Sequence, residues 1–167
     1  VPYFYVAAQL LHGRVDWRGL LWLKPWLYGG WMMLTLALAM ATSFANDLSG
    51  WGLWWNWDPV ENAVYVPWLV LIASMHTMIV FKKSETALKT SIVLVISTFI
   101  LILYATFLVR SGILGNTSVH SFTDLGLSGQ LLIYLLFFLI GSIFLAARVW
   151  KNIPSSEKEA STYSREF

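Results

Sequence analysis

The stretch WGLWWNWDPVENAVYVPWLVLIASMH, residues 51–76, joins a loop with four tryptophans to a long apolar segment. Asp58 suits the N-cap of a helix, Pro59 suits its first position, and Glu61 stands where its carboxylate reaches back to the cap backbone. We therefore predict that a helix begins directly after the last tryptophan. Pro67 lacks a backbone N–H, so it is expected to remove one hydrogen bond from that helix and to kink it.

The composition around this stretch is that of a membrane protein. Hydrophobic residues make up 57% of the 167 residues, charged residues make up 12%, and the mean hydropathy is +0.64. A soluble domain is about half apolar and a quarter charged. Because a transmembrane helix needs about 20 apolar residues, four runs are long enough: residues 26–45, 59–81, 87–109 and 128–150. The predicted fold class is all-α, a polytopic transmembrane helical bundle with four full spans plus the end of a fifth helix in residues 1–11.

The basic residues indicate how this bundle is oriented. Of the eleven lysines and arginines, all but Arg110 fall before the first full span, around the turn at residues 82–89, or near the C-terminal tail. By the positive-inside rule these segments are cytoplasmic, whereas the loops at 46–58 and 110–127 face outward. Residues 1–150 are thus predicted to form one membrane domain, and residues 151–167 a polar cytoplasmic tail.

Two interpretations of the clustered tryptophans stay open on residue types alone. Indoles favour the headgroup level of a bilayer, where one face is apolar and the N–H meets water. This aromatic-belt interpretation fits the scattered tryptophans well: Trp17, Trp22, Trp26 and Trp150. Anchoring requires one or two rings, whereas the outer loop holds four beside two glycines: Trp51, Trp54, Trp55 and Trp57. A flat, apolar, aromatic ligand on the outer surface would explain that concentration.

The three histidines differ in how far their positions call for a functional explanation. His12 lies at the cytoplasmic edge, where a histidine needs no functional explanation. His76 lies inside the second predicted span, where an ionisable side chain is a functional-site hypothesis by default. The alternative for His76 is a neutral imidazole bonded across helices to the hydroxyl of Thr98 or Ser97. His120 lies in the outer loop, on the same side as the clustered tryptophans.

A tryptophan platform beside an outer histidine favours haem as the ligand. Haem is flat and apolar, carries two carboxylate arms, and takes imidazole as its usual axial ligand. Arg110 would meet the haem propionates through charge-assisted hydrogen bonds, although a cation at the C-terminal end of a helix also complements the helix dipole. The chain has no cysteine, so it supplies no thiolate ligand or nucleophile of its own.

Two motifs, in their order, closely resemble one family of haem-handling proteins. WGLWWNWDPVEN followed by PWLVLIASMH, and then TFLVRSGILGNTSVHSF, is similar to the CcmF and NrfE type of cytochrome c maturation protein, which shares a tryptophan-rich WWD loop with the more distant CcsA type. The resemblance covers nearly the whole chain up to Trp150. It implies a multi-pass protein of a bacterial or organellar inner membrane, with the WWD loop on the periplasmic or outer side and the C-terminal tail in the cytoplasm.

The resemblance also implies roles for particular residues. The WWD loop would hold a transient haem while it is joined to apocytochrome c, and the matching residues are Trp51, Trp54, Trp55, Trp57 and Asp58. His120 matches one of two outer histidines that flank this haem, and His76 matches one of two intramembrane histidines that bind a separate b-type haem. Both would be axial ligands of haem iron. The chain would then be a subunit or fragment of a haem–apocytochrome c ligase, with a haem chaperone and other maturation membrane subunits as further partners.

The chain departs from the family pattern in three respects. The partner of His120 is expected upstream of Val1 and the partner of His76 downstream of Phe167, so the chain matches the middle portion of family members. The remainder of the protein or companion chains would complete both ligand pairs. Asn56 stands where an aromatic is common, and NDLSG precedes the loop where the family often has another aromatic. Both changes are expected to soften the platform without removing it.

Two functions without ligation activity stay open beside this one. A b-haem electron-transfer subunit needs two intramembrane histidines that face each other, and this chain offers one. A haem-transport subunit needs broken helices or polar groups along a path through the membrane. Apart from Pro67 and His76, the predicted spans contain only scattered hydroxyls.

Overall fold

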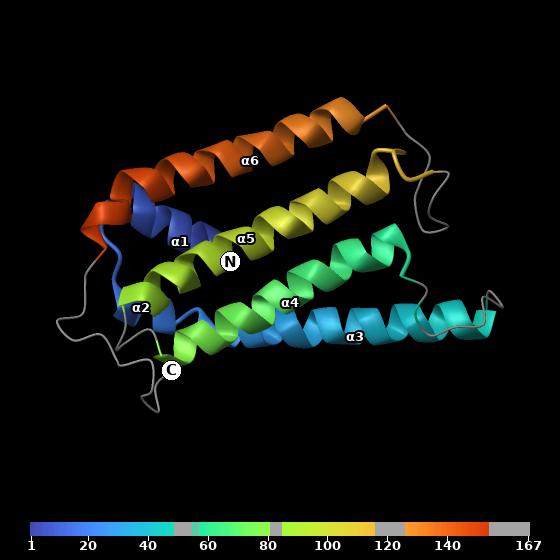
Figure 1. The fold of residues 1–167 in the computed structure, drawn as a ribbon, viewed down its shortest axis with the longest axis horizontal. Helices are drawn as coiled ribbons and strands as arrows, with labels where there is room; N and C mark the ends of the chain where they lie inside the picture. The colour runs from blue at the N-terminus through green and yellow to red at the C-terminus, as the bar shows by residue number, and fades with distance from the viewer. Residues whose placement is uncertain (49–54, 56, 81–84, 116–125, 154–167) are drawn as a thin grey trace.

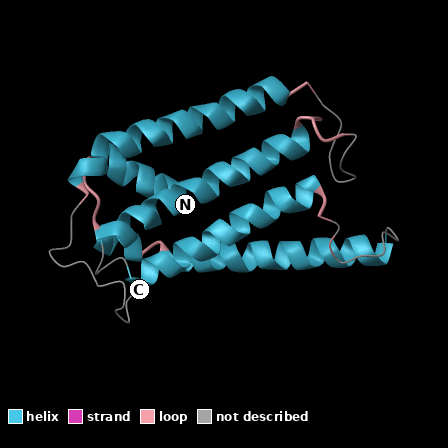
Figure 2. Ribbon diagram, viewed as in Figure 1, coloured by secondary structure: helices cyan, strands magenta, loops and turns pink. Residues whose placement is uncertain are grey.

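The computed structural model describes residues 1–48, 55, 57–80, 85–115 and 126–153, and every regular element within them is a helix (Figure 1, Figure 2). In chain order the elements are α1 (Pro2–Leu11), α2 (Trp17–Leu21), α3 (Lys24–Leu48), α4 (Pro59–Val80), α5 (Glu85–Arg110), α6 (Ser128–Val149) and the 3-10 helix η1 (Trp150–Asn152). The long helices lie side by side in the order α3, α4, α5, α6, and α1 packs against α5 and α6 (Figure 1). The all-α bundle predicted from the sequence is confirmed.

Three of the helical segments are long and apolar enough to cross a membrane: Pro59–Ile79, Thr86–Arg110 and Ser128–Asn152. They correspond to the second, third and fourth predicted spans. α3 occupies the range predicted for the first span and has 25 residues. The described part of α3 contains glycines and rings with polar atoms, such as Tyr28 and Trp31, so its mean hydropathy is lower than that of the three candidate spans. Three of the four predicted spans are therefore supported. The span at residues 26–45 stays a prediction.

The main hydrophobic core lies at one end of the bundle. Leu20 of α2, Leu23 in the α2–α3 connection, Met78 of α4, Ile92 of α5 and Val149 of α6 are almost fully buried there. This is the end where α4 finishes, α5 begins and α6 finishes (Figure 1). The opposite end is therefore less tightly filled, and it carries the tryptophan loop.

α2 was not predicted from the sequence, because its five residues lie in a segment assigned to a cytoplasmic loop. Asp16 caps this helix by accepting a hydrogen bond from the backbone N–H of Arg18 at 2.9 Å. Gly19 lets α2 approach α1 closely, since a Cβ at that position would collide with the hydroxyl of Tyr5 and the side-chain amide of Gln9. The short helix thereby closes the densely packed end of the bundle.

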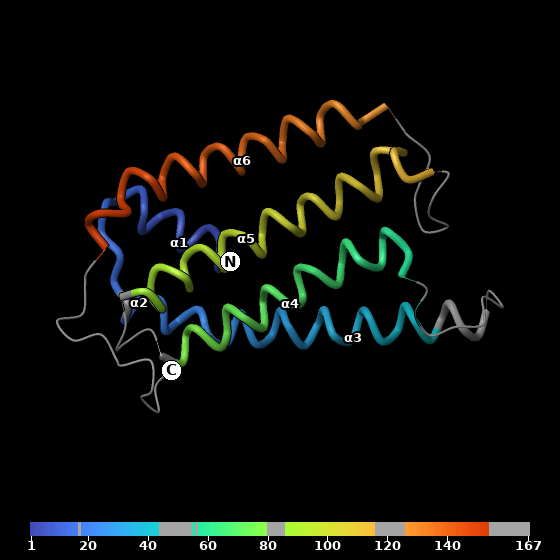
Figure 3. The backbone as a smooth tube through the Cα atoms, in the orientation of Figure 1, coloured from blue at the N-terminus to red at the C-terminus, as the bar shows by residue number. Residues whose placement is uncertain are grey.

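α4 continues through Pro67, which is fully buried inside the helix. Figure 3 shows α4 as one uninterrupted coil from Pro59 onward. The first two turns of α4 therefore form one helix with the rest, as expected where neighbouring helices shield the backbone around a membrane proline.

Bonds between two hydroxyl groups join neighbouring helices at two places in the described structure. Ser91 of α5 donates to Oγ1 of Thr77 of α4 at 2.8 Å, and Ser91 is fully buried. Tyr3 of α1 donates to Oγ of Ser142 of α6 at 2.8 Å, while Ser142 donates to the carbonyl of Phe138 at 2.6 Å. Such bonds are favoured inside a membrane, where water cannot satisfy the hydroxyl.

We predict that Tyr3 stabilises the α1–α6 contact mainly through its ring. The ring stacks on Phe99 at a centroid distance of 4.1 Å and meets Phe138 edge-on at 5.7 Å. Tyr3→Ala should lower the free energy of unfolding in mixed detergent micelles by about 3–5 kcal/mol, whereas Tyr3→Phe should lower it by about 0.6 kcal/mol. Tyr134→Phe, at a half-exposed position of α6, is the control. Equal losses for Tyr3→Phe and Tyr3→Ala would contradict this division.

Candidate functional site

The junction between the tryptophan loop and α4 is a helix cap. Asp58 accepts a hydrogen bond from the backbone N–H of Val60 through Oδ2 at 2.9 Å. Glu61 accepts one from the backbone N–H of Asp58 through Oε2 at 3.4 Å. The reciprocal cap predicted from the order Asp58, Pro59, Glu61 is confirmed. The cap fixes the direction in which the chain passes from the loop into α4.

Trp57 stands in a strained backbone conformation directly before this cap. Its φ of +55° lies in the left-handed region, which a large aromatic residue adopts at a cost of about 1–3 kcal/mol. The side-chain amide of Asn62 donates to the carbonyl of Trp57 at 3.0 Å and holds the turn. Trp57 is 68% exposed, and it directly precedes the helix cap at the start of α4. An exposed indole and a strained backbone therefore occur together at Trp57.

A continuous series of aromatic rings leads from Trp57 into the bundle. Trp57 meets Trp55 edge-on at a centroid distance of 6.0 Å, and Trp55 meets Tyr65 edge-on at 5.6 Å. Tyr65 stacks on Trp68 at 5.6 Å, and Trp68 stacks on Trp31 of α3 at 6.3 Å. We call these five rings the aromatic series. Offset and edge-on contacts of this kind each stabilise by about 0.5–1.5 kcal/mol beyond the burial of area.

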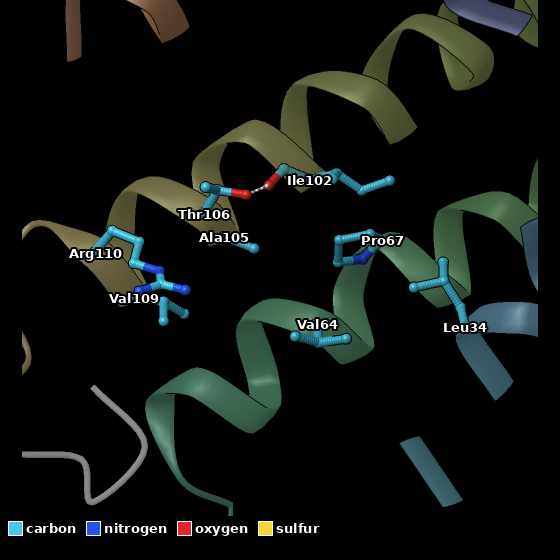
Figure 4. Close-up of a pocket in the computed structure, with 8 residues that line it drawn as sticks. All are labelled: Leu34, Val64, Pro67, Ile102, Ala105, Thr106, Val109 and Arg110. Atoms are coloured by element: carbon cyan, nitrogen blue, oxygen red, sulfur yellow. Dashed lines mark hydrogen bonds between the residues drawn. The ribbon is translucent and has the colours of Figure 1, made fainter. Parts of the chain in front are cut away.

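Two cavities lie on either side of Val64 at this end of the bundle. One has a volume of about 220 Å³ between α3 and α4, and Trp55, Glu61 and Thr42 are among the residues that line it. The other has a volume of about 340 Å³ between α3, α4 and α5, and is apolar apart from Thr106 and Arg110. Figure 4 shows Arg110 extending from the last turn of α5 beside this second cavity. Both hollows would accept apolar groups of a ligand held at the loop.

Two indole N–H groups of the aromatic series, those of Trp31 and Trp55, are buried without a hydrogen-bond partner among the described residues. An unsatisfied buried donor costs about 1–3 kcal/mol. Trp55 also lines the smaller cavity. Its orphaned donor, the exposed Trp57 ring and the two apolar hollows together fit a flat apolar ligand with acceptor groups at its edge, which is the chemistry of haem.

His76 lies on an exposed face of α4, away from its neighbours in the row of helices. Its Nδ1 is hydrogen-bonded to the carbonyl of Ile72 at 2.8 Å. Since a carbonyl only accepts, Nδ1 carries a hydrogen, and in the neutral imidazole the lone pair is then on Nε2, an atom that can ligate a metal. Thr98, the cross-helix partner considered for a structural histidine, instead donates to the carbonyl of Leu94 at 2.8 Å. The arrangement fits an axial haem ligand.

The described structure brings together part of the predicted site. Trp55, Trp57 and Asp58 lie in contact or in sequence, and Arg110 lies at the same end of the bundle (Figure 1). His76 is 18 residues after Asp58, which is about 27 Å along a helix and places it toward the opposite end. The remaining predicted residues, Trp51, Trp54 and His120, lie outside the described residues.

Several residues at this site were not singled out from the sequence. Tyr65 and Trp68 are three positions apart on α4, a spacing that puts two rings on one face of a helix and would have indicated their contact. The partner ring, Trp31, lies in α3, within the apolar run at residues 26–45, where no local pattern indicates its contact with Trp68. Asn62 holds Trp57 through its backbone carbonyl, and no local pattern predicts such a bond.

Comparison with known proteins places the chain among cytochrome c assembly proteins. The sequence pattern of the family described as "Cytochrome C assembly protein" matches residues 6–114. The chain is 41% identical over 144 residues to the cytochrome c-type biogenesis protein CycK of Rhizobium meliloti, with 86% of this chain and 21% of the relative covered. It is 36% identical over 166 residues to the cytochrome c-type biogenesis protein CcmF of Escherichia coli, with 99% of this chain and 25% of the relative covered. The chain thus spans a fifth to a quarter of the length of these relatives, and no solved structure matches it.

We predict that Asp58 limits the opening of the first turn of α4. Asp58→Ala removes the acceptor for the Val60 amide, and loss of such a cap costs about 1 kcal/mol. Hydrogen exchange of the Val60 amide should accelerate about fivefold, which is this free energy at room temperature. Glu61→Gln, which can still reach the Asp58 amide, should leave that rate nearly unchanged. Unchanged exchange in Asp58→Ala would show that the cap does not hold the junction.

Proposed function

Because the chain belongs to the cytochrome c assembly protein family, we propose that it takes part in cytochrome c biogenesis by holding haem for attachment to apocytochrome c. The observation that supports this proposal most is the aromatic series, which ends in an exposed indole at Trp57. Haem is the substrate at this site, and it rests against the loop at residues 46–58. The relatives named above carry the same biological role in their names.

Within this proposal each residue of the outer site has a physical task. Trp55 and Trp57, together with Trp51 and Trp54 of the same loop, cover the apolar faces of the porphyrin. Arg110 meets the propionates beside the cavity that it lines. His120 ligates the iron on one side, and Asp58 holds the loop in place through the helix cap.

The reaction joins cysteine thiols of apocytochrome c to the vinyl groups of haem, so both reacting groups are brought by the partners. The contribution of this chain is to hold the two in a near-attack arrangement. Positioning of this kind supplies a large part of a reaction barrier in well-oriented systems. The strained, fixed Trp57 turn suits such a task, since a loosely held ring would not orient its ligand.

A second haem, of the b type, is proposed at His76. When bound, this group would supply an electron to the iron of the substrate haem. His76 would hold it through Nε2, while the bond from Nδ1 to the Ile72 carbonyl keeps the ring in the ligating tautomer. The second axial histidine would come from the remainder of the protein or from a companion chain.

The topology within the membrane follows the charge pattern. We propose that α3 crosses the bilayer with α4, α5 and α6, because its 25 residues are long enough and its surface carries exposed apolar residues: Met32, Met33, Leu36 and Met40. The loops at 46–58 and 110–127 then face the periplasmic or outer side of an inner membrane, and the C-terminal tail faces the cytoplasm. Apocytochrome c, a haem chaperone and other maturation subunits are the proposed partners.

We predict that the two described loop tryptophans are needed for maturation. Changing both Trp55 and Trp57 to Ala should lower the accumulation of holocytochrome c by about tenfold or more, since two aromatic contacts to haem are lost. The measurement is haem staining of periplasmic cytochrome c, with the amount of inserted protein determined in parallel. Trp22→Ala, at an exposed position in the α2–α3 connection, is the control. Normal maturation in the double variant would reduce the loop to a membrane anchor.

We also predict that His76 is required for a b-type haem signal. Membranes carrying the assembled complex should show a reduced b-type absorption band that His76→Ala abolishes, because the iron loses an axial ligand. His12→Ala is a matched control, since His12 is exposed and its Nδ1 makes the same bond four residues back, to the carbonyl of Ala8 at 2.8 Å. An unchanged spectrum in His76→Ala would refute the assignment.

A further inference from the structure

One hydrogen bond ties α3 to α4 near the middle of α4. Trp68 of α4 donates from Nε1 to Oγ1 of Thr35 of α3 at 2.8 Å. Thr35 in turn donates its hydroxyl hydrogen to the carbonyl of Trp31 at 2.8 Å. The Thr35 hydroxyl thus uses its hydrogen and one lone pair in fixed directions. This arrangement determines where the Trp68 ring lies between the two helices.

The position of Trp68 is transmitted to the loop through ring contacts. Trp31 and Tyr65 both stack on Trp68 with small interplanar angles of 27° and 19°. Trp55 then meets Tyr65 at 65°, and Trp57 meets Trp55 at 84°. Each ring therefore constrains the next one, and a shift of Trp68 changes the support on which Trp55 stands.

We infer that Trp68 and Thr35 are positioning residues for the haem-holding loop, acting through Tyr65 and Trp55. This inference rests on the proposed function, and it identifies residues inside the bundle that set the geometry of the outer site. Neither residue contacts the ligand in this scheme. The bond between them fixes the angle at which Trp55 and, through it, Trp57 present their ring faces.

The location of the bond supports a role in positioning. Trp31, at the inner end of the aromatic series, packs against the main hydrophobic core, whereas Trp55, nearer the outer end, lines a cavity beside Val64. A cavity removes packing partners from the side chains that line it. The aromatic series therefore connects Trp55, which lines a cavity, to the densely packed part of the bundle.

The test uses two substitutions that each remove the bond and retain most of the side-chain volume: Trp68→Phe and Thr35→Val. Iron protoporphyrin IX is titrated onto the assembled membrane complex, and the outer-site dissociation constant and the induced circular dichroism of the Soret band are measured. Each variant should weaken binding about threefold or more, as expected for one hydrogen bond inside a membrane. The induced dichroism should change in both, because it reports the angle between porphyrin and indoles. The double variant should be no weaker than the single ones, since all three lack the same bond.

Two controls separate this bond from general effects of the substitutions. Thr90→Val removes a hydroxyl whose described bond is to the carbonyl of Thr86 in its own helix, at 2.7 Å. Trp26→Phe replaces an indole that is 57% exposed near the start of α3. Both should leave the dissociation constant and the dichroism unchanged. The reduced b-type band at His76 serves as the internal measure of folding in every variant.

Each possible result decides between stated explanations. Wild-type affinity and dichroism in Trp68→Phe and Thr35→Val would overturn the positioning role, while loss of binding in the Trp55→Ala, Trp57→Ala double variant would leave the proposed function standing. Wild-type binding in that double variant as well would overturn the proposed function itself. A b-type band that falls in parallel with outer-site binding would mean that the bond merely holds the fold, and would also overturn the inference.

Discussion

A polar side chain inside a bilayer has to find its hydrogen-bond partner within the protein, because hydrocarbon offers none. Most described hydroxyls meet this demand within their own helix, as Thr90, Thr98 and Thr106 do by donating to a carbonyl one turn earlier. Where a bond crosses between helices, it determines how those helices sit. The Trp68–Thr35 bond sets α4 against α3 in this way, near the middle of α4. The geometry of the outer site thus begins with a hydrogen bond between two membrane helices.

The two ends of the bundle divide stability and function between them. At one end, α2 and the ends of the long helices enclose a dense apolar core. At the other end, the helices part around two cavities, and the strained turn at Trp57 is held by a cap and by one amide of Asn62. Sites that bind ligands are commonly drawn from the less stable parts of a structure. A bundle clamped at its far end can keep such an open site without losing its fold.

More of the fold than of the candidate site could be predicted from the sequence. Apolar runs and the cap at Asp58 predicted the ranges of the long helices within a few residues, because both signals are local along the chain. The short α2 was missed, since its five residues lie in a segment assigned to a cytoplasmic loop. At the site, residue types pointed to Trp55, Trp57 and His76, but the ring contacts of Trp31 depend on how two helices pack. The left-handed turn at Trp57 has no signal in the sequence, because nothing favours a tryptophan there except its surroundings.

The continuity of α4 connects the two proposed haem sites. Asp58 caps its first turn, Trp68 fixes its middle against α3, and His76 projects from its last third. A break at Pro67 would have let the loop move independently of His76. The helix instead continues through the proline, which is buried among its neighbours. Loop and intramembrane histidine are therefore attached to one continuous helix, and their separation of about 27 Å along its axis is set by the number of residues between them. A change in the tilt of α4 would move both sites together, so any coupling between them has a direct mechanical route through this one element.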